Sequence, residues 1–152
     1  IQPEKCTGCR FCEIACSFVH EGKFNPSKSR IQVMKWEEDA VDVPITCQQC
    51  DDAPCEFICP ANAFHREQDT GALLIDQDLC IGCRMCMSVC PFGAIRCYDD
   101  EMVKCDLCNG DPACVKFCEP KAIEYTTLNK ASVTRGRAAA LAFDRSLKKE
   151  IL

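Results

Sequence analysis

The spacing of the cysteines constrains this chain more than any other feature of its sequence. The 152 residues contain 17 cysteines, a content far above that of ordinary globular proteins. Sixteen of them fall into four short quartets separated by cysteine-poor segments. The quartets are Cys6, Cys9, Cys12 and Cys16; Cys47, Cys50, Cys55 and Cys59; Cys80, Cys83, Cys86 and Cys90; and Cys105, Cys108, Cys114 and Cys118. Cysteines clustered four at a time indicate metal sites, whose ligands must converge on one centre.

The third quartet has the spacing C-x2-C-x2-C-x3-C followed by Pro91, which is the run that holds 4Fe–4S clusters in bacterial ferredoxins. In such a run the fourth cysteine binds the other cluster of a pair. The second quartet is also followed by a proline, Pro60, and the fourth has Pro120 one place later. Four quartets therefore predict two pairs of sites, with four 4Fe–4S clusters that pass on single electrons.

Disulfides and structural zinc are the competing explanations of so much cysteine. A secreted disulfide scaffold needs a signal peptide, and none is visible, although a chain that starts without Met leaves a removed leader open. Closely packed cysteines also suit a disulfide framework poorly, because each bridge needs a particular Cα separation. A zinc ribbon uses two separate C-x2-C pairs, whereas here a third and a fourth cysteine follow each pair. The pattern therefore favours iron–sulfur over zinc, and zinc over disulfides.

The quartets form an A-B-A-B repeat. The first and third read CTGCRFCEIAC and CIGCRMCMSVC, and the second and fourth read CQQCDDAPCEFICP and CDLCNGDPACVKFCEP. In the second type we expect Asp52 and Asp111 to cap short helices that have Pro54 and Pro112 in their first turn. These helices are expected to carry Cys55 and Cys59, and Cys114 and Cys118.

Short strands are expected between the quartets. Residues 30–36 alternate in polarity and are expected to pair with residues 41–46, and residues 63–67 with 72–75 around Gly71. Residues 92–96 and 121–125 have the small apolar pattern of a strand that follows a ferredoxin quartet. The tail, residues 132–149, is a helix candidate with a discontinuous apolar face.

Composition excludes several classes of protein. No apolar stretch approaches the roughly 20 residues needed to cross a bilayer, so the chain is expected to be soluble or peripheral, and cytoplasmic. The formal net charge is −5, and cluster ligation by thiolates makes it more negative, which argues against a nucleic-acid partner. Residues 119–152 carry seven Lys/Arg against four Asp/Glu, a mildly basic tail.

The sixteen spaced cysteines resemble the four-cluster ferredoxin-like subunits of molybdenum and tungsten oxidoreductases, whose type is the dimethyl sulfoxide reductase iron–sulfur subunit. The resemblance covers residues 5–125 and implies an α+β fold of two nested bacterial-ferredoxin-like dicluster units with short hairpins and short helices, followed by a C-terminal helix. It divides the chain into an outer unit of residues 1–46 and 96–125, an inner unit of residues 47–95, and a docking tail of residues 126–152. Ser17 and Glu119 depart from the family's pattern by replacing a proline after the outer quartets.

The nested arrangement of this family also implies which cysteines bind each cluster. We number the four implied sites I to IV. Site I is Cys6, Cys9, Cys12 and Cys118; site II is Cys105, Cys108, Cys114 and Cys16; site III is Cys47, Cys50, Cys55 and Cys90; and site IV is Cys80, Cys83, Cys86 and Cys59.

The resemblance implies an electron-transfer subunit rather than an enzyme. In agreement with this expectation, no catalytic residues are identified in the sequence. The segment from His20 to Pro26 resembles the electron-transfer partners of tungsten aldehyde oxidoreductases and benzoyl-CoA reductases. This resemblance favours a tungsten or molybdenum catalytic subunit as the partner. A further electron-accepting or flavin subunit is expected as a second partner. Alternatives are a free polyferredoxin carrier, the equivalent subunit of a hydrogenase or carbon monoxide dehydrogenase, and a non-redox metal scaffold.

Three residue types outside the quartets have ordinary explanations. His20 and His65 are expected on a loop and a hairpin as surface or packing residues. Cys97, the seventeenth cysteine, is interpreted as a small buried hydrophobic residue, with a redox or replacement-ligand role as the alternative. Trp36 is expected to pack rather than to relay electrons.

Overall fold

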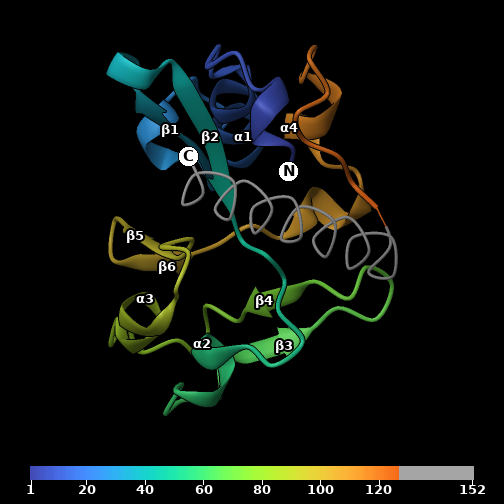
Figure 1. Cartoon of the computed structure of the whole chain (residues 1–152). Coiled ribbons are helices and arrows are strands. Elements are labelled where there is room, and N and C mark those ends of the chain that lie inside the picture. Colours follow the sequence, from blue (N-terminus) through green and yellow to red (C-terminus); the bar gives the residue numbers. More distant parts are fainter. Residues whose placement is uncertain (127–152) are drawn as a thin grey trace.

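The computed structural model describes residues 1–126, which form two lobes joined by extended segments (Figure 1). One lobe contains α1 (Phe11–Glu21), β1 (Ile31–Trp36), β2 (Val41–Thr46) and α4 (Ala113–Lys116). The other contains α2 (Pro54–Phe57), β3 (Phe64–Arg66), β4 (Leu73–Ile75) and α3 (Met85–Val89), with β5 (Arg96–Tyr98) and β6 (Glu101–Val103) beside it. Four 3₁₀ turns complete the described part of the fold: Pro3–Lys5, Pro26–Lys28, Glu37–Asp39 and Leu107–Gly110. The predicted α+β class is confirmed.

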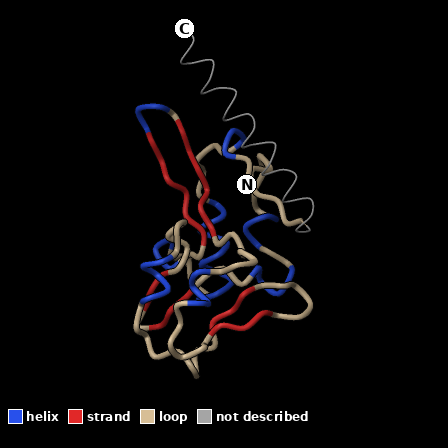
Figure 2. The backbone as a smooth tube through the Cα atoms, turned by 60° about the horizontal axis from the view of Figure 1, so that its bottom comes forward, coloured by secondary structure: helices blue, strands red, loops and turns tan. Residues whose placement is uncertain are grey.

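The first hairpin forms as its alternating sequence predicts. β1 and β2 pair antiparallel, with Ile31 opposite Thr46 and Trp36 opposite Val41. Ile31 and Val33 face the core, whereas the distal half of β1 is exposed. The hairpin consequently projects from the body of the molecule, with the Glu37–Asp39 turn at its tip (Figure 2).

Two further hairpins pair antiparallel as separate two-stranded sheets. In β3–β4, which the sequence predicts, Phe64 lies opposite Ile75 and Gly71 adopts the left-handed φ of +68°. The β5–β6 hairpin is not predicted. Its two-residue turn is Asp99 and Asp100, with φ values of 48° and 65°, the positive values that tight hairpin turns require.

Four expectations about local structure are wrong. Residues 92–96 are not a strand, because pairing begins only at Arg96, and residues 121–125 contain no strand. Asp52 and Asp111 do not cap helices: α2 starts at Pro54 after Ala53, and α4 starts after Pro112, with no side-chain cap at either. Each helix is a single turn, so Cys59 and Cys118 lie beyond its end. The expected tail helix lies outside the described residues.

The two lobes have separate small cores, and cysteines form part of both. The first core consists of Cys12, Cys16, Ile31, Val33, Cys118, Ala122 and Ile123. The second consists of Ala53, Cys55, Leu73, Cys86, Ile95 and Met102. With so few aliphatic side chains, neither core is large enough to fix the fold by apolar burial alone.

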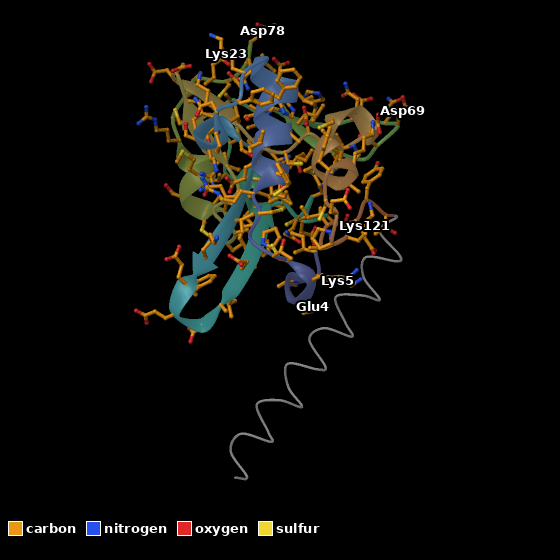
Figure 3. All side chains as sticks on the ribbon, turned by 90° about the horizontal axis from the view of Figure 1, so that it is seen from above. Glu4, Lys5, Lys23, Asp69, Asp78 and Lys121 are labelled. Atoms are coloured by element: carbon orange, nitrogen blue, oxygen red, sulfur yellow. The ribbon has the colours of Figure 1, made fainter. Side chains whose placement is uncertain are left out.

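Charged side chains lie around the periphery of the molecule. Figure 3 labels six that point outward, namely Glu4, Lys5, Lys23, Asp69, Asp78 and Lys121. No helix among residues 1–126 is long and apolar enough to cross a membrane.

Candidate metal centres

Three cavities among the described residues each bring together three cysteines of one quartet and the last cysteine of another. One is lined by Cys6, Cys9, Cys12 and Cys118, the cysteines of site I. A second is lined by those of site III, Cys47, Cys50, Cys55 and Cys90. The third is lined by those of site IV, Cys59, Cys80, Cys83 and Cys86. The rest of each wall is almost entirely apolar, as in the cavity of site I, where Val33, Pro44 and Ile123 contribute.

The four cysteines of site II are also neighbours. Burial raises the pKa of the Cys114 thiol, and the charges of Cys105, Cys16 and Cys108 raise it further. Cys16 lies on α1 and Cys105 follows β6, so residues separated by about ninety positions meet here. The structure therefore brings the cysteines of sites I, III and IV together around three cavities, and it places Cys16, Cys105 and Cys108 near Cys114.

The properties of these thiols fit an iron–sulfur cluster. Burial, together with Glu13 and nearby cysteines, raises the pKa of Cys12 to about 12, and burial raises that of Cys86 to about 11. Groups of buried thiols repel one another when ionised, so they become thiolates only when a cationic core binds and releases their protons. Sulfur-only donor sets in apolar walls suit iron–sulfur clusters.

Backbone N–H groups donate hydrogen bonds to the fourth cysteine of three quartets. The amide of Ala63 lies 3.4 Å from the Sγ of Cys59, and the amide of Ala94 lies 3.4 Å from the Sγ of Cys90. In the first quartet the donor to Cys16 comes from a different segment, the amide of Arg30, at 3.3 Å. Such hydrogen bonds to sulfur are among the features by which proteins set cluster potentials.

The cysteine loops of the repeat share one backbone conformation. Gly8 and Arg10 have φ values of 65° and 61°, and the equivalent Gly82 and Arg84 have 66° and 63°. At Gly8 a Cβ would lie 2.5 Å from the carboxylate of Asp42, so this position also needs the missing side chain for space. These left-handed residues turn the loop so that three thiols face one point.

A charged network adjoins site II. His20 is on α1 rather than on a loop, and its Nδ1 lies 2.8 Å from the carbonyl oxygen of Cys16 and 3.7 Å from its Sγ. The Nε2 of His20 lies 3.1 Å from the Oδ1 of Asp106, and the Oδ2 of Asp106 accepts a hydrogen bond of 2.7 Å from Arg30. Because carbonyl and carboxylate oxygens can only accept, both ring nitrogens donate, and the hydrogen bond with Asp106 is the largest influence raising the pKa of His20 to about 12.

The same network sets the charge of its other members. Burial raises the pKa of Asp106, but His20, the backbone N–H of Cys108 and Arg30 together hold it well below its usual range. Burial likewise raises the pKa of Cys16, yet the hydrogen bonds with His20 and the Arg30 amide lower it below the ordinary value. Ligand atoms of His20, Asp106 and Cys108 all lie within 4.8 Å of one another, so the network directly contacts a cysteine of site II.

A buried carboxylate adjoins site I. Glu13 follows Cys12 on α1 and is 0% exposed. Its carboxylate accepts hydrogen bonds from the backbone N–H of Val33 at 2.7 Å and from Arg10 at 2.8 Å. Neither Glu13 nor Asp106 is predicted from the sequence as part of a site, because both need partners that are distant in sequence.

Comparison with known proteins identifies the family. The model described as "4Fe-4S dicluster domain" matches residues 39–128, and one described as "4Fe-4S binding domain" matches residues 3–19. The chain belongs to the 4Fe-4S dicluster family. The predicted cluster type is thereby confirmed, while the number of clusters and the ligands of each stay predictions.

Two curated relatives are similar to much of this chain. The polyferredoxin-like subunit of an aliphatic sulfonate oxidoreductase from Pyrococcus furiosus is 43% identical over 120 residues, which cover 78% of this chain and 69% of the relative. One of the subunits of the anaerobic dimethyl sulfoxide reductase of Escherichia coli is 33% identical over 163 residues, which cover 93% of this chain and 78% of the relative. The predicted resemblance to dimethyl sulfoxide reductase iron–sulfur subunits is confirmed.

One solved structure with a similar chain is the active-site complex BamBC of benzoyl coenzyme A reductase with benzoyl-CoA. The match has a TM-score of 0.49 at 25% identity and covers 92% of this chain and 86% of the other.

Proposed function

We propose that this protein is the electron-transfer subunit of an oxidoreductase complex and holds four 4Fe–4S clusters at sites I to IV. The observation that carries the ligand assignment is the composition of the walls of three cavities, in each of which the fourth cysteine comes from another quartet. This crossing is the rule for paired clusters in ferredoxins. Bound clusters supply one-electron chemistry, and the chain supplies their spacing, insulation and electrostatic surroundings.

The sites follow one another in the order I, II, III, IV. Cys12 of site I is close enough to influence the pKa of Cys114 of site II. Cys47 of site III likewise influences Cys105 of site II. Cys55 of site III influences Cys86 of site IV. Each neighbour relation links consecutive sites, which supports a linear relay through both lobes.

The ends of this relay are the exposed sites. All seventeen cysteines lie within residues 1–126, and among them only Cys9 of site I and Cys83 of site IV are exposed. Exposed apolar side chains stand beside both, with Phe11 and Phe117 near Cys9, and Ile81 and Met85 near Cys83. Electrons would therefore enter and leave at Cys9 and Cys83, where apolar rims suit contact with partner proteins.

The relatives' names support the choice of partner. They are subunits of an aliphatic sulfonate oxidoreductase and of a dimethyl sulfoxide reductase, so a catalytic oxidoreductase subunit is the first expected partner. We favour a tungsten or molybdenum enzyme, with a further electron-accepting or flavin subunit at the other end. A cytoplasmic location fits, because reduced thiols are the rule there.

The proposed division into units follows the sites. Residues 1–46 with 96–125 would hold sites I and II, and the inserted residues 47–95 would hold sites III and IV. Met102 of β6 packs in the core of the second lobe, so the hairpin after site IV joins the two units rather than belonging to one. The tail from residue 126 is proposed to dock the partner.

Elemental analysis of the complex isolated anaerobically from its native source tests the proposal. About 16 iron atoms in this chain, beyond those of its partners, with tungsten or molybdenum co-purifying, is the expected result. Nickel instead would point to a hydrogenase or carbon monoxide dehydrogenase, and a solitary iron-loaded chain would indicate a free carrier. Zinc without iron would overturn the whole assignment.

A further inference from the structure

A lysine is buried at the middle of the molecule, next to the first cysteine of the fourth quartet. Lys104 is only 4% exposed. Its ammonium donates to the backbone carbonyl of Leu73, to that of Cys105 at 3.0 Å, and to the side-chain oxygen of Gln49 at 3.4 Å. All three acceptors are neutral, and no carboxylate among residues 1–126 forms an ion pair with this lysine.

A buried ammonium without a counter-charge is costly, because three neutral oxygens replace only part of its hydration. Negative charge must therefore lie nearby in the functional protein. The charges available are those of the cysteine thiolates and the clusters that they bind. Lys104 directly precedes Cys105 of site II, and it is close enough to Cys55 of site III to counteract the rise in pKa that burial causes there.

The lysine thus lies where the two lobes and the two central sites meet. Gln49 stands between Cys47 and Cys50, and it donates to the Cys105 carbonyl at 2.8 Å while it accepts from the amide of Leu73 at 3.0 Å. Gln49 alone therefore links the same three segments without any charge. A purely structural junction does not need the ammonium, and in the repeat the position equivalent to Lys104 is the neutral Thr46.

We propose that Lys104 is a potential-setting residue for the middle of the relay, a fixed positive charge between sites II and III. Reduction adds one negative charge to a cluster, so a nearby cation stabilises the reduced state and makes the potential more positive. The charge of Lys104 therefore makes the clusters at sites II and III easier to reduce than they would be in the same surroundings without this charge. This inference rests on the proposed four-site relay and adds a specific role for a residue that binds no iron.

Substitution of Lys104 followed by anaerobic redox titration, with the clusters monitored by electron paramagnetic resonance, tests the proposal. Lys104→Gln keeps a donor without the charge, and Lys104→Met removes both. Lys116→Met is the matched control, since Lys116 lies in the fourth quartet between Cys114 and Cys118 but is exposed and paired with Asp111. Sites are assigned to signals by the signals lost in Cys16→Ser and Cys90→Ser.

We expect the reduced-to-oxidised ratio of the site II and site III signals to fall at least tenfold at a fixed potential in Lys104→Gln, a shift of about 59 mV for a one-electron couple. Sites I and IV, and all signals in Lys116→Met, should keep their potentials. Unchanged central potentials, or an equal shift in Lys116→Met, would overturn the inference.

The iron content separates this inference from the proposed function. A wild-type chain with markedly fewer than about 16 iron atoms contradicts the relay itself. Full iron with unchanged potentials in Lys104→Gln contradicts only the role of the lysine. If both neutral variants lose iron, Lys104→Arg distinguishes the two explanations. Full iron content with wild-type potentials at sites II and III would support the role of the charge. Lower potentials at these sites despite the retained charge would overturn the inference.

Discussion

The two copies of the internal repeat keep the same backbone around their cysteines but place different side chains beside them. Quartets one and three share the C-x-G-C-R loop and its left-handed φ values. The residue after the third cysteine, however, is the buried Glu13 in the first copy and Met87 in the other. Four residues after the fourth cysteine, the first copy has His20 and the other has Ala94.

The same contrast holds between quartets two and four. The residue after the first cysteine is Gln48 in the second quartet and Asp106 in the fourth, and only Asp106 joins a network of His20 and Arg30. At these three positions the outer unit therefore has buried or half-buried charges, whereas the inner unit has an amide and apolar groups. Because nearby charge and hydrogen bonds set cluster potentials, we expect the proposed sites to have the same kind of ligands but unequal potentials.

Removing the clusters should have the largest effect, and it should affect the two lobes unequally. Cysteines form much of both cores, so chelation of iron under anaerobic conditions should abolish most of the far-ultraviolet circular dichroism. Residual protection from hydrogen exchange is expected in the lobe of α1, β1 and β2, which has an 11-residue helix and six-residue strands. Less protection is expected in the other lobe, whose strands have only three residues. An apo-chain with native circular dichroism would contradict this view of the cores.

Replacing a fourth cysteine should damage the site of the other quartet in its pair. Cys16→Ser should remove the cluster proposed to be bound by Cys105, Cys108 and Cys114. Likewise, Cys59→Ser should remove the cluster proposed to be bound by Cys80, Cys83 and Cys86. Each variant is expected to contain about 12 iron atoms in place of about 16. Iron analysis combined with paramagnetic resonance checks this. Loss of the signal of the substituted residue's own quartet would show that the crossing is wrong.

Two of the three hairpins can be predicted from the sequence, because they depend on local spacing. The cysteine quartets can be recognised in the same way, whereas the assignment of their cysteines to sites I to IV stays a prediction. Cys quartets, the alternation in β1 and the turn at Gly71 are all readable within about ten residues. The β5–β6 hairpin is missed because its turn is Asp99-Asp100, without the glycine that marks such turns. Residues 92–96 look like a strand because of their small apolar pattern, but only Arg96 pairs with another strand, and Ala94 and Ile95 are buried before the strand begins.

The charged surroundings of the sites cannot be predicted in the same way. His20 and Asp106 are 86 positions apart, and Glu13 bonds to the backbone of Val33. Pairings of this kind arise from the nesting of one unit inside the other. The sequence signal that could have located these residues is the internal repeat. A charged residue in one copy that corresponds to an uncharged residue in the other, such as Met87, Ala94 or Gln48, indicates a position where the two units differ.

Truncating His20 should affect site II and leave site III unchanged. His20→Ala removes the donor to the Cys16 carbonyl and the positive partner of Asp106, so the site II potential should become more negative, with a change of about tenfold in the reduced-to-oxidised ratio. Redox titration measures the shift. His65→Ala, an exposed position on β3, is the matched control and should change nothing. A shift at site III, whose equivalent position is Ala94, would contradict the comparison.

Exchanging the residues after the third cysteine should move sites I and IV in opposite directions. Glu13→Gln removes a negative charge beside Cys12 and should raise the potential of site I, and Met87→Glu adds one and should lower that of site IV. Both shifts should be smaller than that of His20→Ala, because Arg10 already neutralises part of the Glu13 charge and Met87 is exposed. Shifts in the same direction at both sites would show that the carboxylate does not act through its charge.

The smallest expected effect concerns the turn of β5–β6, where the backbone conformation of one residue rather than its charge is expected to decide the stability. Asp100 has φ of 65° and its side chain is 95% exposed, so its ion pair with Arg84 is screened and contributes little. Asp100→Gly should stabilise the protein by about 0.5 kcal/mol, because glycine adopts the left-handed conformation without strain, and this gain exceeds its extra entropy in the unfolded chain. Asp100→Ala removes the same charge but keeps a Cβ, so it should not stabilise. The temperature at which cluster absorbance is lost under anaerobic conditions compares the two variants, and an equal rise in both would assign the effect to the charge instead of the backbone.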